Sequence, residues 1–305
     1  MPGPLNVAAD RLGPHIRRTP LLRTSVNARP LAFKLEFLQV TGSFKIRGAL
    51  NALLTRGAGR GAASHVVTAS GGNHGLGVAV AARLLGVDAT VYVPGPVPEV
   101  KARRIGAAGA EVIRFGNSYA DAEMEARHLA TRDGLVYVHA YDDPAVVAGQ
   151  ATVGLEILAD MPECDVIAVP VGGGGLLAGV AGAVSSASPG RFVVGVEPEG
   201  CPTLHEAVSA GIPVDVAIDG GSVAASALGA SRAGRLALAA CQSGNVRLAM
   251  VSDKQITAAR DRLWEEFRLA VEPAAATVFA AWLSGQVPGD FPCLVLSGAN
   301  ADWTP

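Results

Sequence analysis

The sequence predicts an α/β protein built from two doubly wound lobes, each with a parallel sheet. Two observations favour this fold class. Short apolar runs alternate with segments of helical periodicity along most of the chain, which is the pattern of strands joined by crossover helices. Turns rich in glycine follow several of these runs, where a strand of such a fold leads into its helix.

The first strand is predicted over residues 31–38, and the apolar spacing after Gly48 predicts a helix. In the compact series that follows, we expect strands at 65–70, 89–94, 111–115 and 135–139 and helices at 75–85, 99–108 and 119–133. In a second series, we expect strands at 166–171, 192–197, 247–251 and 293–297. The expected helices of the second series are 153–159, 175–185, 204–210, 232–240, 252–267 and 277–284, with a loop over 212–229.

The strand at 31–38 has no neighbour of its own in sequence and must pair with the second series. We therefore expect a large domain of residues 1–62 and 145–305. Residues 63–144 are then a small domain inserted into the large one.

Composition excludes several function classes. The 305 residues are 50% hydrophobic and 17% charged with a net charge of −2, so a large core can form and nothing favours a nucleic-acid partner. No apolar run reaches membrane-spanning length, and the N-terminus has no secretion signal. The four cysteines lie far apart without a C-x-x-C pair, so we expect a cytoplasmic protein with free thiols.

Lys45 stands at the predicted start of a helix, after the small-residue turn Thr41–Ser43. Positive charge is disfavoured there, and desolvation together with the helix dipole would lower the pKa of the amine and free it as a nucleophile. The ordinary alternative is an exposed lysine whose stem reaches water. Lys45 alone does not decide between the two.

Polar or glycine-rich residues follow four of the predicted strands. Ser70–Gly75 and Gly172–Gly175 are turns whose backbone amides suit an anion, and the alternatives are an ordinary strand-to-helix turn and a flexible loop. Glu197 is either a cation ligand or a surface acid, and Ser297 is either a ligand hydroxyl or a turn serine. Together with Lys45 these groups match a pyridoxal phosphate bound covalently to the lysine.

The sequence resembles the serine/threonine dehydratase family, which includes serine racemase and has fold type II of the pyridoxal-phosphate enzymes, like the tryptophan synthase β-subunit. The matching motifs occur in family order over nearly the whole chain. They are Phe33–Glu36, Ser43–Gly48, Ser70–Gly75, Pro170–Leu176, Val196–Pro198, Val271–Pro273 and Leu296–Gly298.

The resemblance implies a role for each site residue. Lys45 carries the cofactor and takes the substrate Cα proton, while Ser297 bonds the pyridine nitrogen. The remaining cofactor contacts implied by the resemblance are Phe44, Asn73, Gly172, Gly173, Gly174, Gly175, Leu176 and Glu272. The residues implied for the substrate carboxylate are Ser70, Gly71, Gly72, Asn73 and His74.

Two departures from the family pattern affect the expected chemistry. Gly71 stands where serine racemase has a serine that acts on the opposite face of Cα, so the sequence disfavours racemisation. Glu197 and Cys201 match cation-ligand positions, but Thr203 replaces the acid of the divalent set, which leaves a monovalent cation or none.

We therefore predict an ammonia-lyase that eliminates water from L-threonine or L-serine to give a 2-keto acid and ammonia. The alternatives are β-elimination or β-replacement on another amino acid, serine racemase-like activity, and a pyridoxal-phosphate-binding protein without turnover. The family also implies a homodimer.

Overall fold

The structure is a computed structural model that describes residues 4–58, 64–187 and 190–300. The chain divides into two compact units. The smaller unit comprises the residues up to Arg17 together with Lys45–Gly149, and the larger comprises Arg18–Phe44 with the residues from Gln150 onward. The main segment of the smaller unit, Lys45–Gly149, contains the small domain predicted over residues 63–144.

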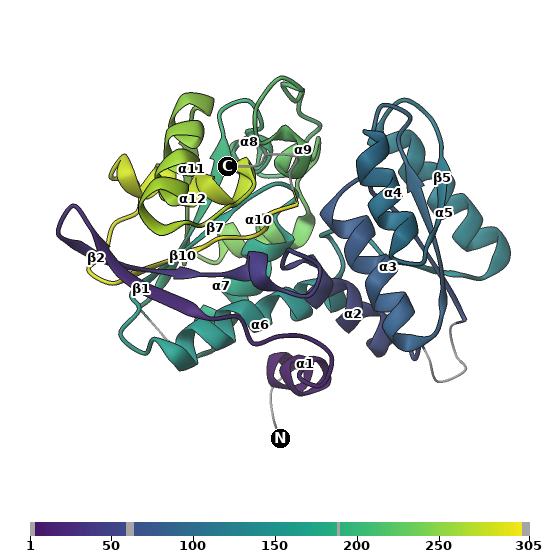
Figure 1. The fold of residues 1–305 in the computed structure, drawn as a ribbon, viewed down its shortest axis with the longest axis horizontal. Helices are drawn as coiled ribbons and strands as arrows, with labels where there is room; N and C mark the ends of the chain where they lie inside the picture. Colours follow the sequence, from purple (N-terminus) through teal and green to yellow (C-terminus); the bar gives the residue numbers. More distant parts are fainter. Residues whose placement is uncertain (1–3, 59–63, 188–189, 301–305) are drawn as a thin grey trace. The chain divides into compact units, whose positions relative to one another are not determined.

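The larger unit contains a six-stranded sheet in the order β1-β2-β10-β7-β8-β9 (Figure 1). Its strands are β1 (Leu21–Val26), β2 (Arg29–Lys34), β10 (Pro292–Val295), β7 (Val166–Pro170), β8 (Phe192–Pro198) and β9 (Val246–Val251). The pairs from β2 to β9 are parallel, but β1 pairs with β2 antiparallel, so this sheet is mixed where we predicted a parallel one. A tight turn through Asn27 and Ala28, both at positive φ, joins the hairpin.

Alternate residues of these strands enter different cores, as the period of two requires. Ala168 and Leu294 pack with α11 (Asp253–Phe267) and α12 (Pro273–Leu283). Ile167 and Cys293 pack in a separate apolar cluster with α6 (Pro144–Asp160) and α7 (Gly175–Ala187). Figure 1 shows α11 and α12 on one side of these strands and α6 and α7 on the other.

Four further helices lie in the described part of the larger unit. They are η1 (Glu36–Leu38), α8 (Thr203–Ala210), α9 (Ala225–Leu228) and α10 (Arg235–Gln242). The strand predicted over 31–38 therefore ends at Lys34 and passes into a 3₁₀ turn. The predicted loop over 212–229 contains the short helix α9.

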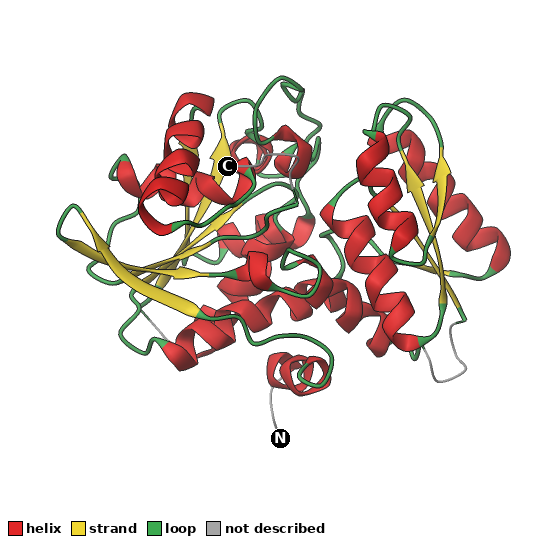
Figure 2. Ribbon diagram, viewed as in Figure 1, coloured by secondary structure: helices red, strands yellow, loops and turns green. Residues whose placement is uncertain are grey.

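The smaller unit is built on a four-stranded parallel sheet in the order β5-β4-β3-β6. Figure 2 shows strands of this sheet in yellow with helices in red beside them. Its strands are β3 (His65–Ala69), β4 (Asp88–Val93), β5 (Glu111–Arg114) and β6 (Val136–Tyr137). Its helices are α1 (Pro4–Leu12), α2 (Lys45–Thr55), α3 (Asn73–Leu85), α4 (Glu99–Ala107) and α5 (Tyr119–Asp133). Val66 packs toward α2 and α3 and Val67 toward α5, so this sheet too is covered on both faces.

The α/β fold class predicted from the sequence is confirmed. Strands and helices alternate in the predicted order, and most boundaries agree within a few residues. No helix among the described residues is long and apolar enough to cross a membrane.

Candidate functional site

Lys45 is the first residue of α2, as the turn before it predicts. Its side chain is half-buried, and Nζ donates a hydrogen bond to the main-chain oxygen of Ala140 at 3.0 Å. Gly77 of α3 lies against it, because a Cβ at Gly77 would be 3.2 Å from the Lys45 carbonyl carbon. The lysine is thus held within the smaller unit, with its amine at a main-chain carbonyl oxygen.

The turn Ser70–Gly72 leads from β3 into α3, which begins at Asn73. The Gly72 amide donates to the Ser70 hydroxyl at 3.2 Å, and the amides of the first turn of α3 have no acceptor within the helix. A Cβ at Gly71 would lie 2.3 Å from Cγ2 of Val97. Val97 therefore occupies the space that a side chain at position 71 needs.

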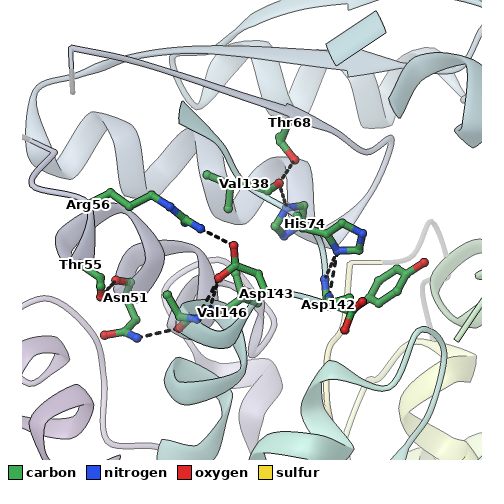
Figure 3. A network of polar contacts seen from close by, with 12 residues as sticks. Asn51, Thr55, Arg56, Thr68, His74, Val138, Asp142, Asp143 and Val146 are labelled. Carbon is green, nitrogen blue, oxygen red and sulfur yellow. Dashed lines mark hydrogen bonds and ion pairs between the residues drawn. The ribbon is translucent and has the colours of Figure 1, made fainter. Parts of the chain in front are cut away.

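His74 turns its side chain into the core of the smaller unit, where 3% of the residue is exposed. Its Nε2 lies 3.2 Å from the Val138 carbonyl oxygen, which also accepts from the Thr68 hydroxyl (Figure 3). Nδ1 has no partner among the described residues. Desolvation, with a smaller contribution from the Lys45 charge, lowers the pKa of His74 to about 3, so the imidazole is neutral.

The glycine loop, defined here as Gly172–Gly175, joins β7 to α7 in the larger unit. Gly174 has φ +86, and a Cβ there would lie 2.3 Å from Cβ of Ala237. A Cβ at Gly172 would lie 3.0 Å from Cα of Leu228. These two glycines are required by the packing of α9 and α10, while the amides at the start of α7 remain available to an anion.

Ser297 follows β10, the strand next to β7, so it lies at the same carboxyl edge of the sheet as the glycine loop. Its hydroxyl has no hydrogen bond to another described residue, although only 3% of the residue is exposed. Its carbonyl oxygen accepts from the Phe44 amide at 3.1 Å, and Lys45 is the next residue in the chain. The Phe44 segment is therefore tied to the end of β10.

Glu272 approaches the same turn. Its amide donates to the Gly298 carbonyl at 3.1 Å, and a Cβ at Gly298 would lie 2.5 Å from its Oε1. The carboxylate of Glu272 therefore packs directly against the turn that carries Ser297.

Glu197, a predicted cation ligand, accepts hydrogen bonds from the amides of Leu204 at 2.6 Å and His205 at 2.9 Å at the start of α8. Desolvation raises its pKa to about 7. The Thr203 hydroxyl donates to the Ala230 carbonyl, and Cys201 is buried. Across the described residues no three carboxylate, thiol or imidazole side chains cluster to hold a metal ion. The cation ligands therefore stay a prediction.

Sequence reasoning missed the acceptor of the Lys45 amine. A main-chain oxygen such as that of Ala140 carries no side-chain signal, and 95 residues separate it from the lysine. The apolar run 135–139 indicated only that a strand precedes it.

Comparison with known proteins identifies the family. A family model described as pyridoxal-phosphate dependent enzyme matches residues 12–298. The chain belongs to this family. The enzyme is 38% identical to an L-threonine ammonia-lyase of Geobacter sulfurreducens, over 97% of this chain and 74% of the relative. It is 34% identical to a catabolic L-threonine dehydratase of Staphylococcus aureus, over 99% of this chain and 89% of the relative.

Solved structures agree with this assignment. The crystal structure of T.th. threonine deaminase superposes with a TM-score of 0.90 at 35% identity, covering 99% of both chains. Maize serine racemase superposes with a TM-score of 0.91 at 30% identity, covering 98% of this chain and 93% of the racemase. The predicted family, fold type II architecture and cofactor are confirmed.

The residues present fit pyridoxal phosphate. The glycine loop leads into the N-terminus of α7, whose first amides have no acceptor within the helix and can donate to a phosphate. At the same edge of the sheet, the Ser297 hydroxyl, which bonds to no other described residue, is a neutral partner for the pyridine nitrogen.

Proposed function

We propose that this enzyme is an ammonia-lyase that eliminates water from L-threonine or L-serine and yields a 2-keto acid and ammonia. The observation that carries the proposal is the similarity to L-threonine ammonia-lyases along almost the entire chain. The proposal extends to a cytoplasmic homodimer that acts on a free amino acid and on neither nucleic acid nor membrane.

We assign the cofactor contacts as follows. Lys45 forms the covalent bond to the cofactor aldehyde, and Asn73 bonds the ring hydroxyl. Phe44 lies along the ring, and Glu272 supports the turn beside it. The phosphate contacts are Gly172, Gly173, Gly174, Gly175 and Leu176. These roles follow from the family resemblance and agree with the glycine packing and the buried Ser297 hydroxyl.

When bound, the cofactor supplies an electron sink for the pair left on the substrate Cα. The chain supplies the proton transfer and the orientation. Lys45 Nζ takes the Cα proton, and the amides of the Ser70–Gly72 turn and of the first turn of α3 hold the substrate carboxylate. Loss of the β-hydroxyl as water leaves an enamine, which water hydrolyses to the keto acid and ammonia.

Ser297 directs this chemistry because a neutral hydroxyl does not keep the pyridine nitrogen protonated as a carboxylate would. Negative charge then persists at Cα and expels the β-hydroxyl. We propose no divalent ligand set, since Glu197 already accepts two amides and Thr203 donates to a carbonyl.

Racemisation is the second candidate, favoured by the similarity to maize serine racemase. The space beside Gly71 argues against it, because Val97 fills the position of a side chain that would act from there. Formation of D-serine from L-serine at a rate comparable with keto-acid formation would favour this candidate.

The proposal is tested by incubating the cofactor-loaded enzyme with L-threonine and L-serine and measuring 2-keto acid. We expect turnover that is lost in Lys45→Ala, together with the visible absorbance of the covalently bound cofactor. Lys254→Ala, at an exposed lysine on α11, is the matched control and should retain both. Full activity and absorbance in Lys45→Ala would overturn the assignment of the lysine.

A further inference from the structure

The segment after β6 surrounds the acceptor of the Lys45 amine. We call residues Val138–Asp143 the carbonyl turn, because the oxygen of Ala140 in its middle accepts the hydrogen bond from Lys45 Nζ at 3.0 Å. The turn and Lys45 both belong to the smaller unit. The groups that fix the conformation of this turn therefore determine the position of the Ala140 oxygen relative to the Lys45 amine.

The side chain of His139 accepts hydrogen bonds from the backbone of its own turn. Its Nδ1 accepts hydrogen bonds from the amides of Tyr141 at 3.1 Å and Asp142 at 2.9 Å, so the ring proton lies on Nε2. The Nε2 side faces Glu123 of α5, with 3.5 Å to Oε1. The ring also packs edge-on against Tyr141, with centroids 4.6 Å apart. One side chain thus holds the two peptide groups that follow Ala140.

Other groups anchor both ends of the turn (Figure 3). The Val138 oxygen accepts from His74 and Thr68. Asp143 accepts from the amides of Ala145 and Val146 at the start of α6 and pairs with Arg56, the residue after α2.

Burial keeps His139 neutral despite the carboxylates around it. Glu123 on α5 pairs with Arg127, Asp142 lies in the turn itself, and Asp143 is paired with Arg56. Burial lowers the pKa of His139 more than Glu123 raises it. The Nδ1 lone pair therefore remains an acceptor for the two amides.

We propose that His139 is a positioning residue for Lys45: by fixing the carbonyl turn, it places the Ala140 oxygen where it receives the lysine amine whenever that amine is not bonded to the cofactor. A half-buried ammonium needs such a hydrogen-bond partner, because burying it unpaired costs free energy. An amine that is already held in a fixed position also loses less conformational entropy when it next reacts. The inference rests on the proposed function in taking Lys45 as the covalent lysine.

The first test uses the full-length, cofactor-free protein. An amine-selective acylating reagent is applied, and the modification of Lys45 relative to exposed Lys254 is followed by peptide mass spectrometry. His139→Leu removes the acceptor of the Tyr141 and Asp142 amides, so the Ala140 oxygen is no longer held in place for Lys45. We then expect Lys45 to react roughly tenfold faster, the effect of losing one hydrogen bond to a charged group. His139→Asn should behave like the wild type, because the Asn oxygen is as many bonds from Cα as Nδ1.

His139→Gln places its oxygen one bond farther out and should resemble His139→Leu. Comparison of the Gln and Asn variants preserves the test if His139→Leu does not fold. His128→Leu, on the exposed side of α5, is the matched control and should label like the wild type. Equal Lys45 labelling in the wild type, Gln and Leu variants, or equal acceleration in the Asn and Gln variants, overturns the proposal.

A second measurement is the rate at which the cofactor-free variants regain visible absorbance when pyridoxal phosphate is added. We expect slower capture in His139→Gln than in His139→Asn, and equal rates contradict the proposal. Failure of the wild type to form keto acid would refute the lyase function but would leave the labelling result valid. The two ideas therefore fail separately.

Discussion

At the scale of single residues, both the backbone conformation and the packing at Gly174 disfavour a side chain. Its φ of +86 disfavours any side chain, and Cβ of Ala237 would lie 2.3 Å from a new Cβ. We predict that Gly174→Ala lowers the free energy of unfolding by roughly 2–4 kcal/mol, from backbone strain plus overpacking. Urea unfolding of the cofactor-free protein measures this. Gly182→Ala, in α7 with open space around it, is the control and should be neutral or stabilising.

At the scale of secondary-structure elements, α11 depends on a capping box. The Ser252 hydroxyl accepts from the Gln255 amide at 3.4 Å, and Gln255 Oε1 accepts from the Ser252 amide at 2.9 Å. We predict that Ser252→Ala costs about 1 kcal/mol of unfolding free energy, the usual cost of a lost N-cap. Ser209→Ala on the exposed face of α8 should change it by less than about 0.5 kcal/mol. Equal losses in the two variants would show that the cap contributes nothing.

At the scale of the whole molecule, the two units should respond differently to acid. In the smaller unit, the buried His74 and the partly buried His139 are neutral. Below pH 6.5, His74 binds a proton in the unfolded chain but stays neutral in the folded one. The free energy of unfolding therefore falls as the pH drops from 6.5 toward about 3. For His74 alone, the loss over that window is on the order of 5 kcal/mol. Hydrogen exchange at pH 7 and pH 4.5 should therefore show the smaller unit opening first, and earlier opening of β7 and β8 would contradict this.

The sequence by itself determined the order of strands and helices, the position of Lys45 at a helix start, and the placement of the glycine loop and Ser297 after strands. These signals are local: hydrophobic period, turn residues and caps act over a few neighbouring positions. They sufficed for the α/β class and for the family.

Only the tertiary structure decided the features that join distant residues. It paired β1 with β2, turned His74 inward to Val138, set Glu197 at the start of α8 and made Gly172 and Gly174 necessary through Leu228 and Ala237. It also brought the Ala140 oxygen to Lys45. Such contacts depend on how separate elements pack, and a backbone carbonyl or a filled space leaves no mark in the local pattern of residues.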